Sequence, residues 1–209
     1  MSQSLNIESI CDQLCAKDHI LAEVIDIVGP CTLAPGHAAF DFLCDSIVRQ
    51  QLSKHAANTI IHRFHKLFES GVPAPKQLLS LSEQEVLDAG ISNRKYGYLL
   101  DLARRTETQQ LNFSTLHEED DSTIRRLLTE VKGIGDWTVD MYLLFGLGRI
   151  DVFPVKDLAL RRSMSSLYGL DVDDLDGLEK VAEKWKPYRS IASWYMYRHG
   201  DLRPRGSTR

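Results

Sequence analysis

Long apolar runs and targeting signals are missing from this chain of 209 residues. It contains no stretch of about eighteen consecutive apolar residues, the length that crosses a bilayer as a helix. The first ten residues, MSQSLNIESI, have neither the basic start nor the apolar segment of a secretory signal. We therefore expect no membrane association and an intracellular location, which is the cytoplasm in a prokaryote and the nucleus in a eukaryote.

Cysteine is scarce and scattered. The four cysteines, at positions 11, 15, 31 and 44, form no CxxC pair and have no histidine cluster near them. Zinc sites and iron–sulfur clusters both require such groupings. The sequence therefore predicts reduced thiols in the core, no cofactor and no metal site built from side chains.

Excess positive charge is also absent, since 25 Lys and Arg stand against 29 Asp and Glu, a formal net charge of −4. Bulk electrostatics thus give no reason to expect a polyanion such as DNA as a partner. The charges are unevenly spread, with acidic runs at 117–121 and 171–179 and basic runs at 49–55, 92–98, 161–162 and 203–209. Either these runs are ordinary solvated surfaces, or a basic face lies opposite an acidic one.

Strand patterns are lacking as well, because no alternating apolar–polar run is bounded by an Asn-Gly or Asp-Gly turn. Apolar residues instead recur at helical spacing through most of the chain. Ser82 and Glu85 form a capping box, and Ser53, Ser92 and Asp136 each stand as an N-cap before a periodic segment. The sequence predicts an all-α protein of about ten short helices, with no linker or repeat that divides it.

The segment VKGIGDWTVD, at 131–140, is the most informative one. Gly133 and Gly135 can adopt positive φ at little steric cost, so the chain can reverse within a few residues before a helix capped by Asp136. Amides at a helix N-terminus bind a phosphate through hydrogen bonds and the helix dipole, without any positive side chain. Either the segment is such a phosphate-binding hairpin, or its glycines serve only the turn between two helices.

The wider context carries a family resemblance. The run LLTEVKGIGDWTVDMYLLFGLGRIDVFPVKDLALRRSM, at 127–164, resembles the helix-hairpin-helix, Gly/Pro-loop and Asp signature of the HhH-GPD base-excision DNA glycosylase superfamily. It is most similar to the 3-methyladenine DNA glycosylase II branch, in which a Gly-hydrophobic-Gly-x-Trp-Thr hairpin precedes a DVFP-x-x-D element at the spacing found between Trp137 and Asp157. The segments RQQLSKHAANTI and WKPYRSIASWYMY also look like that branch.

The resemblance covers roughly positions 30 to 200 and implies a single glycosylase domain over 1–209. Its HhH-GPD fold would consist of two packed helical subdomains with a cleft for DNA and the target base between them. We expect one subdomain at about 45–115 and the other from 1–44 plus 116–209.

The resemblance assigns catalysis to Asp157. Loss of a base from DNA builds positive charge on the deoxyribose, and a fixed carboxylate stabilises that charge and orients the attacking water. Pro154 places Asp157 at a helix start, so the alternative is that this aspartate is only an N-cap. Asp151 is the nearest competitor, and we expect it to hold the loop.

Trp137 occupies the position where the endonuclease III-like relatives carry their Schiff-base lysine, which implies a monofunctional enzyme that uses water. Neither Lys132 nor Lys156 matches that position. Trp137 and Tyr197 match base-pocket positions, where an aromatic face would bind an electron-poor ring. Trp194 is a further pocket candidate with a core role as its alternative, and Met141 replaces an aromatic residue of some relatives.

Two further elements are implied for DNA binding. A plug that fills the gap left by the flipped base falls in a helix–helix turn, where Gln51 aligns with the plugging position. Its neighbours in the turn are Gln50, Leu52 and Ser53, and the alternative is an ordinary turn. Backbone contacts would come from Gly133, Gly135 and Thr138 of the hairpin, which also includes Ile134. Lys132 of the hairpin and Arg161 would add electrostatic support. Hairpin carbonyls of this family often also hold a monovalent cation.

The predicted reaction is hydrolytic release of alkylated purines, of the 3-methyladenine and 7-methylguanine types, in base excision repair. The predicted partner is double-stranded DNA that contains alkylated bases, with no obligate protein partner and a monomeric state. Two alternatives stay open: a non-enzymatic DNA-binding module that uses the hairpin, and a glycosylase for oxidised, mismatched or deaminated bases.

Overall fold

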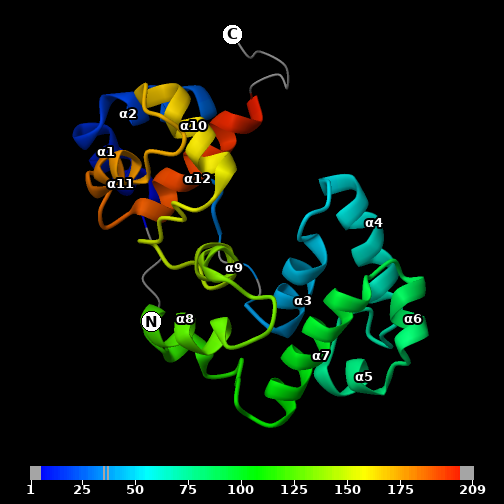
Figure 1. Cartoon of the computed structure of the whole chain (residues 1–209). Coiled ribbons are helices and arrows are strands. Elements are labelled where there is room, and N and C mark those ends of the chain that lie inside the picture. Colours follow the sequence, from blue (N-terminus) through cyan, green and yellow to red (C-terminus); the bar gives the residue numbers. More distant parts are fainter. Residues whose placement is uncertain (1–5, 35, 37, 203–209) are drawn as a thin grey trace. The chain divides into compact units, whose positions relative to one another are not determined.

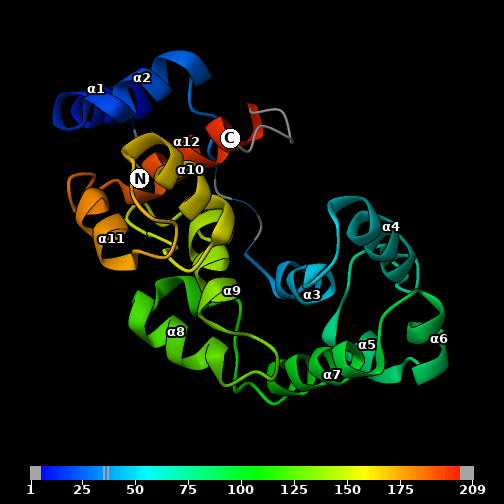
Figure 2. The same cartoon turned by 45° about the horizontal axis from the view of Figure 1, so that its top comes forward.

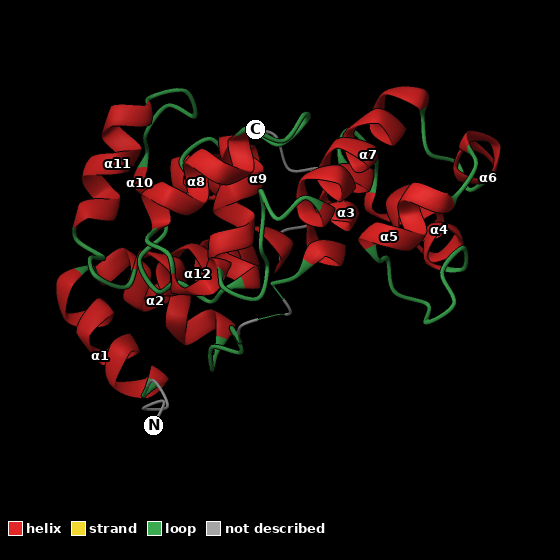
Figure 3. Ribbon diagram, turned by 90° about the horizontal axis from the view of Figure 1, so that it is seen from below, coloured by secondary structure: helices red, strands yellow, loops and turns green. Residues whose placement is uncertain are grey.

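The computed structural model describes residues 6–34, 36 and 38–202. These residues form twelve α-helices, one 3-10 turn and one π-helical turn, and no strand occurs among them (Figure 3). The all-α prediction is confirmed, with two helices more than the ten or so expected. Across the described ranges, no helix is both long enough and apolar enough to cross a membrane. The basic run at 203–209 lies outside the described residues.

The chain forms two compact units. Unit 1 comprises residues 1–34 and 148–209, and unit 2 comprises residues 35–147. Residues 45–115, expected as one subdomain, all lie in unit 2, which also takes in 35–44 and 116–147. In the sequence, unit 2 is therefore one continuous segment, and the two segments of unit 1 precede and follow it.

The described part of unit 1 contains five α-helices: α1 (Ile7–Lys17), α2 (His19–Val28), α10 (Leu158–Tyr168), α11 (Leu175–Glu183) and α12 (Arg189–Leu202) (Figure 1). Helix α12 packs against α10 and α2, and α1 packs against α2. Residues 190–196 of α12 are all buried. A helix that is buried on every side is the centre of its core, and α12 has this place in unit 1.

A buried carboxylate ties the parts of unit 1 together. Asp18 is 4% exposed, and its Oδ1 accepts hydrogen bonds from the first amides of α2, at Ile20 (3.1 Å) and Leu21 (3.2 Å). Its Oδ2 accepts from the Tyr168 hydroxyl and from Trp185 Nε1, both at 2.9 Å. Burial raises the pKa of Tyr168, which keeps its hydroxyl a donor. One side chain thus caps α2 and joins it to α10 and to the segment after α11.

The described part of unit 2 contains the other seven α-helices: α3 (Phe40–Arg49), α4 (Lys54–His65), α5 (Pro75–Ser80), α6 (Glu83–Asp88), α7 (Asn93–Glu107), α8 (Asp121–Thr129) and α9 (Asp136–Met141) (Figure 2). A π-helical turn, Tyr142–Gly146, continues α9, and a 3-10 turn, Leu116–Glu118, precedes α8. Helix α7 packs against α5, α6 and α3, while α8 packs against α9. The serine N-caps predicted from the sequence are present, at Ser53, Ser82 with its capping box, and Ser92.

All four thiols are free. Cys44 is fully buried, but Cys11, Cys15 and Cys31 are only partly buried, so the core location expected of all four is wrong for three of them. Burial raises the pKa of Cys15, Cys31 and Cys44, which favours their protonated form.

Asp18→Ala is expected to lower the free energy of unfolding by about 3 kcal/mol, because it removes a helix cap worth about 1 kcal/mol and leaves two buried donors without an acceptor at about 1 kcal/mol or more each. Urea denaturation followed by far-UV circular dichroism measures the change. Asp12→Ala, at an exposed aspartate of α1, is the control and should change stability by less than about 0.5 kcal/mol. A loss of less than about 1 kcal/mol for Asp18→Ala would contradict the central role of this carboxylate.

Candidate active site

The hairpin between α8 and α9 turns at Gly133. This residue has a φ of +82°, in the left-handed region that favours glycine, and a Cβ here would collide with the ring of Tyr98 on α7. The positive φ expected at Gly135 is wrong, since its φ is −111°, the extended conformation usual for an N-cap. The backbone therefore requires glycine at 133 and not at 135.

Asp136 is the first residue of α9, and Gly135 is the N-cap in its place, which corrects the prediction for Asp136. The physical reason is the backbone, which is extended at Gly135 and helical from Asp136 onward. The Asp136 carboxylate lies 3.6 Å from the guanidinium of Arg125 on α8. Arg125 also pairs with Asp140, which is 7% exposed on α9. The two helices of the hairpin are thus joined by ion pairs that no local motif indicates.

Two hairpin amides are engaged within unit 2. The N–H of Lys132 donates to Asp101 Oδ2 of α7 (2.9 Å), and the N–H of Ile134 donates to Val131 O (3.1 Å). The Ile134 and Thr138 side chains are buried, whereas Lys132 is exposed. These two amides are therefore not available to the phosphate contact that the resemblance implies for the hairpin.

The turn between α3 and α4, residues 50–53, is the segment that the resemblance assigns to the plug, and we call it the plug turn. Gln51 lies at its tip with a φ of +58°, a left-handed conformation that is rare for a residue other than glycine. Its side-chain oxygen accepts a hydrogen bond from Arg94 Nη2 (3.2 Å). Leu52 is 37% exposed, and Ser53 caps α4 through the amide of Ala56.

Gln50 connects the plug turn to the hairpin. Its Nε2 donates to the carbonyl oxygen of Gly133 at 2.8 Å. One of the hairpin carbonyls available to a monovalent cation is therefore already bound by a side-chain amide in this structure. The plug turn and the hairpin, which sequence reasoning treated as separate elements, are in direct contact.

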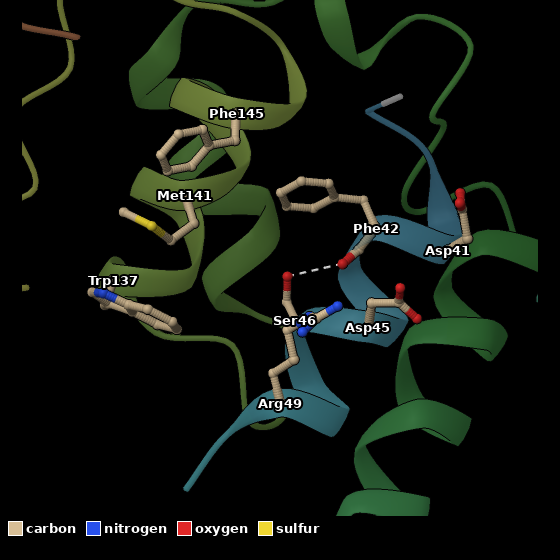
Figure 4. A pocket seen from close by; sticks show the side chains of 8 residues that line it. All are labelled: Asp41, Phe42, Asp45, Ser46, Arg49, Trp137, Met141 and Phe145. Atoms are coloured by element: carbon tan, nitrogen blue, oxygen red, sulfur yellow. Dashed lines mark hydrogen bonds between the residues drawn. The ribbon is translucent and has the colours of Figure 1, made fainter. Parts of the chain in front are cut away.

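Helices α3 and α9 line an open pocket of about 470 Å³ within unit 2 (Figure 4). Trp137, Met141 and the π-turn residue Phe145 follow one another at helical spacing and face α3 across it. The α3 side of the lining consists of Asp41, Phe42, Asp45, Ser46 and Arg49. Trp137 and Met141, both predicted pocket residues, are brought together here, and Trp137 is 39% exposed.

Two carboxylates lie in the α3 lining, and both were missed by sequence reasoning. Asp45 Oδ1 lies 2.8 Å from His65 Nε2 of α4, and burial raises the pKa of Asp45 against the lowering effect of His65. Asp41, Asp45 and Arg49 recur every four residues of a helix whose other residues are apolar except for Ser46. That polar stripe was the available signal, and it is weak because solvated helix faces have the same spacing.

Asp157 lies in unit 1 as the N-cap of α10. Its Oδ1 accepts hydrogen bonds from the amides of Ala159 (2.8 Å) and Leu160 (3.0 Å), and the residue is 9% exposed. These two bonds fix the orientation of the carboxylate. The cap proposed as an alternative to catalysis is therefore real, and it leaves the catalytic assignment open.

The loop before Asp157 is anchored on α12. Asp151 receives hydrogen bonds from Arg189, including Nε at 2.7 Å and Nη2 at 3.0 Å, as expected for a residue that holds the loop. Ser190 donates to Arg149 O (2.6 Å) and accepts from the amide of Val152 (2.9 Å). These contacts hold the chain that leads into the Asp157 cap.

The other predicted site residues of unit 1 lie on α12 and α10. Trp194 is 6% exposed and packs edge-on against Tyr195, with the ring centroids 4.9 Å apart. Tyr197 is partly buried. Arg161, expected to support DNA binding, forms an ion pair with Asp173 at 2.6 Å. Trp194 has the environment of the core residue that was its alternative.

Comparisons with known proteins show the family of this chain. The model of the HhH-GPD superfamily of base excision DNA repair proteins matches residues 44–187, which include the plug turn, the hairpin and Asp157. The alkylbase DNA glycosidase-like protein mag2 of Schizosaccharomyces pombe is 29% identical, over 99% of this chain and 100% of mag2. DNA-3-methyladenine glycosylase 1 of the same yeast is 32% identical, over 78% of this chain and 73% of that protein.

Solved structures are similar as well. The DNA-3-methyladenine glycosidase of Bacillus halodurans matches with a TM-score of 0.82 at 34% identity, over 92% of this chain and 89% of that one. The Mag1 glycosylase of S. pombe, in complex with abasic DNA, matches with a TM-score of 0.81 at 27% identity, over 90% of this chain and 95% of that one. The protein therefore belongs to the HhH-GPD superfamily of base excision DNA repair proteins, in its 3-methyladenine DNA glycosylase branch.

Proposed function

We propose that the protein is a monofunctional DNA glycosylase that hydrolyses the N-glycosidic bond of alkylated purines, of the 3-methyladenine and 7-methylguanine types, and leaves an abasic site. The observation that carries the proposal is the Asp157 carboxylate, fixed by two amides at the start of α10 inside the matched family segment. The names of the relatives support the substrate class.

The role of Asp157 follows from the charge that develops during the reaction. As the purine departs, the deoxyribose becomes oxocarbenium-like, and a carboxylate opposite it stabilises the positive charge. Such stabilisation is effective only when the charged group does not have to reorient as the reaction proceeds. The hydrogen bonds from Ala159 and Leu160 meet that requirement.

Trp137 supports hydrolysis over lyase chemistry. A bifunctional relative needs an amine at this position to form a Schiff base, and an indole cannot do so. The pocket of unit 2 offers Trp137, Phe42 and Phe145 as aromatic surfaces. An N3- or N7-alkylated purine is a flat cation, and aromatic faces bind it by stacking and cation–π attraction.

We propose that backbone amides of the hairpin bind the phosphates of duplex DNA. Gln51, at the tip of the plug turn, would fill the space that the flipped base leaves. Mag1 is known in complex with abasic DNA, the product of the proposed reaction. We further propose that the protein acts as a monomer without an obligate protein partner, in the compartment that contains the DNA.

Asp157→Asn is expected to lower the rate of base release by at least about 100-fold, because it removes a preorganised negative charge. Asparagine is as good an N-cap as aspartate, so α10 should keep its start and the protein its stability and DNA affinity. Single-turnover release of bases from methylated duplex DNA, resolved by chromatography, measures the effect. Asp174→Asn, the same change at the N-cap of α11, is the matched control and should keep full activity.

The same assay separates the proposal from its rivals. Full activity of Asp157→Asn would show that this aspartate is only a cap. Absence of base release from the wild-type protein, with binding retained, would favour a non-enzymatic DNA-binding module. Release of oxidised or mismatched bases in preference to methylated purines would favour a different lesion class.

Borohydride should trap no covalent adduct between this protein and alkylated duplex DNA, because Trp137 supplies no amine for a Schiff base. The measurement is a denaturing gel of labelled DNA after reduction, with a bifunctional lyase as the positive control. A trapped band from this protein would contradict the monofunctional mechanism and would direct attention to Lys132 and Lys156.

A further inference from the structure

Helix α7 contacts both DNA-binding elements of unit 2. Lys95 reaches the plug turn, Tyr98 lies against Gly133 of the hairpin, and Asp101 accepts the amide of Lys132. These three residues follow one another at successive turns of one helix. The two elements therefore share a rigid support.

Lys95 makes the most specific of these contacts. Its Nζ donates to the carbonyl oxygens of Val48 and Gln50, both at 2.7 Å. The C=O groups in the last turn of a helix have no helical partner, and the helix dipole favours a positive charge there. The ammonium therefore caps the C-terminus of α3 at the point where the plug turn begins.

Lys95 is 8% exposed, which is unusual for a lysine. Burial lowers its pKa, and the neighbouring Arg94 does so to a smaller extent. Burying an ammonium is unfavourable unless good acceptors compensate for the lost water. The two short hydrogen bonds to Val48 O and Gln50 O compensate for the burial of the ammonium. An apolar side chain of similar size could not form them, so it could not hold these carbonyls in place.

The turn that Lys95 holds is itself constrained. Gln51 at its tip has a left-handed backbone, which persists only when the surroundings impose it. Gln50, whose carbonyl binds Lys95, donates through its side chain to Gly133 O. The position of the tip is thus set from two sides, by α7 through Lys95 and by the hairpin through Gln50.

We propose that Lys95 is a positioning residue for the plug: by fixing the carbonyls of Val48 and Gln50, it holds Gln51 where it can enter the space of a flipped base. The inference rests on the proposed function, since it assumes that the plug turn meets damaged duplex DNA. Lys95 is buried beneath the turn and acts through Gln51.

The test exploits the fact that a plug matters only in a duplex, where the gap left by a flipped base must be filled. Lys95→Met keeps the length of the side chain and removes the ammonium. We expect it to slow base release from duplex DNA by about 10- to 100-fold, the scale typical of a misplaced group near a reacting site. Release from single-stranded DNA of the same sequence should change by less than about twofold, because no gap is present there.

Two control variants accompany it. Lys76→Met, at an exposed lysine of α5, removes the same charge and should leave both rates unchanged. Lys95→Arg keeps a cation with several donors and should recover part of the duplex activity. Thermal unfolding of each variant confirms that it is folded at the assay temperature. Equal losses on duplex and single-stranded DNA for Lys95→Met would overturn the proposal.

A double-mutant cycle with Gln51→Ala tests whether Lys95 acts through the plug. If it does, Lys95→Met should have little further effect once Gln51 is truncated, so the double variant should be about as slow on duplex DNA as the slower single variant. If the fold-losses in rate of the two single variants multiply in the double variant, Lys95 acts independently of Gln51. That result would also overturn the proposal.

Binding to a duplex with a stable abasic analogue separates failure of this inference from failure of the proposed function, because it requires no chemistry. Fluorescence anisotropy should show about tenfold weaker binding of Lys95→Met to that duplex and unchanged binding to the single strand with the same analogue. If the wild-type protein released no base but this difference were found, the positioning role of Lys95 would be supported and the proposed enzyme activity would be refuted. Equal binding of the wild type and Lys95→Met to the abasic duplex would refute the positioning role of Lys95, whether or not the wild-type protein releases bases.

Discussion

Hydrogen bonds between charged side chains and the open ends of short helices are the interaction on which this protein depends. Each short helix leaves several N–H groups at its start and several C=O groups at its end without a helical partner. Asp18 binds the start of α2, Asp157 the start of α10, and the buried ammonium of Lys95 the end of α3. Hydrogen bonds to a charged group are shorter and stronger than neutral ones, so they fix both partners. The helix ends thereby become rigid points from which side chains and turns are presented.

This interaction also explains why the two roles of Asp157 do not exclude each other. A catalytic carboxylate must be held in its reactive orientation before the substrate binds, and hydrogen bonds can do this. The amides at the start of α10 donate such bonds to Asp157. The amides of Ala159 and Leu160 both donate to one oxygen atom, Oδ1, and these two bonds fix the plane of the carboxylate. Sequence reasoning set the cap against catalysis because each accounts for an aspartate after a proline. In the structure the cap is the means by which a catalytic aspartate would be positioned.

The parts of the fold that the sequence predicted are those set by neighbouring residues. Ser53, Ser82 and Ser92 cap helices as expected, because a serine and the amide three positions later need no distant partner. The turn at Gly133 was predictable for the same reason. Asp136 was misassigned by one position, because the extended backbone that marks the N-cap of α9 lies at Gly135. The contact of Gln50 with Gly133 joins positions 83 residues apart, and no pattern within either segment encodes it.

Part of the negative net charge of the chain, which does not favour binding to DNA, lies at helix ends. Acidic run 117–121 contains Asp120, the N-cap of α8, and acidic run 171–179 contains Asp174, the N-cap of α11, so part of the negative charge lies where helix dipoles stabilise it. The basic runs at 49–55 and 92–98 meet at the plug turn, where Arg94 binds Gln51. Within them Lys95 points inward to the carbonyls of α3 and adds rigidity to that turn, not surface charge. Two of the basic runs thus lie together at the plug turn. On the proposed function this local charge would meet DNA, and backbone amides, which a count of charged residues does not register, would supply the remaining affinity.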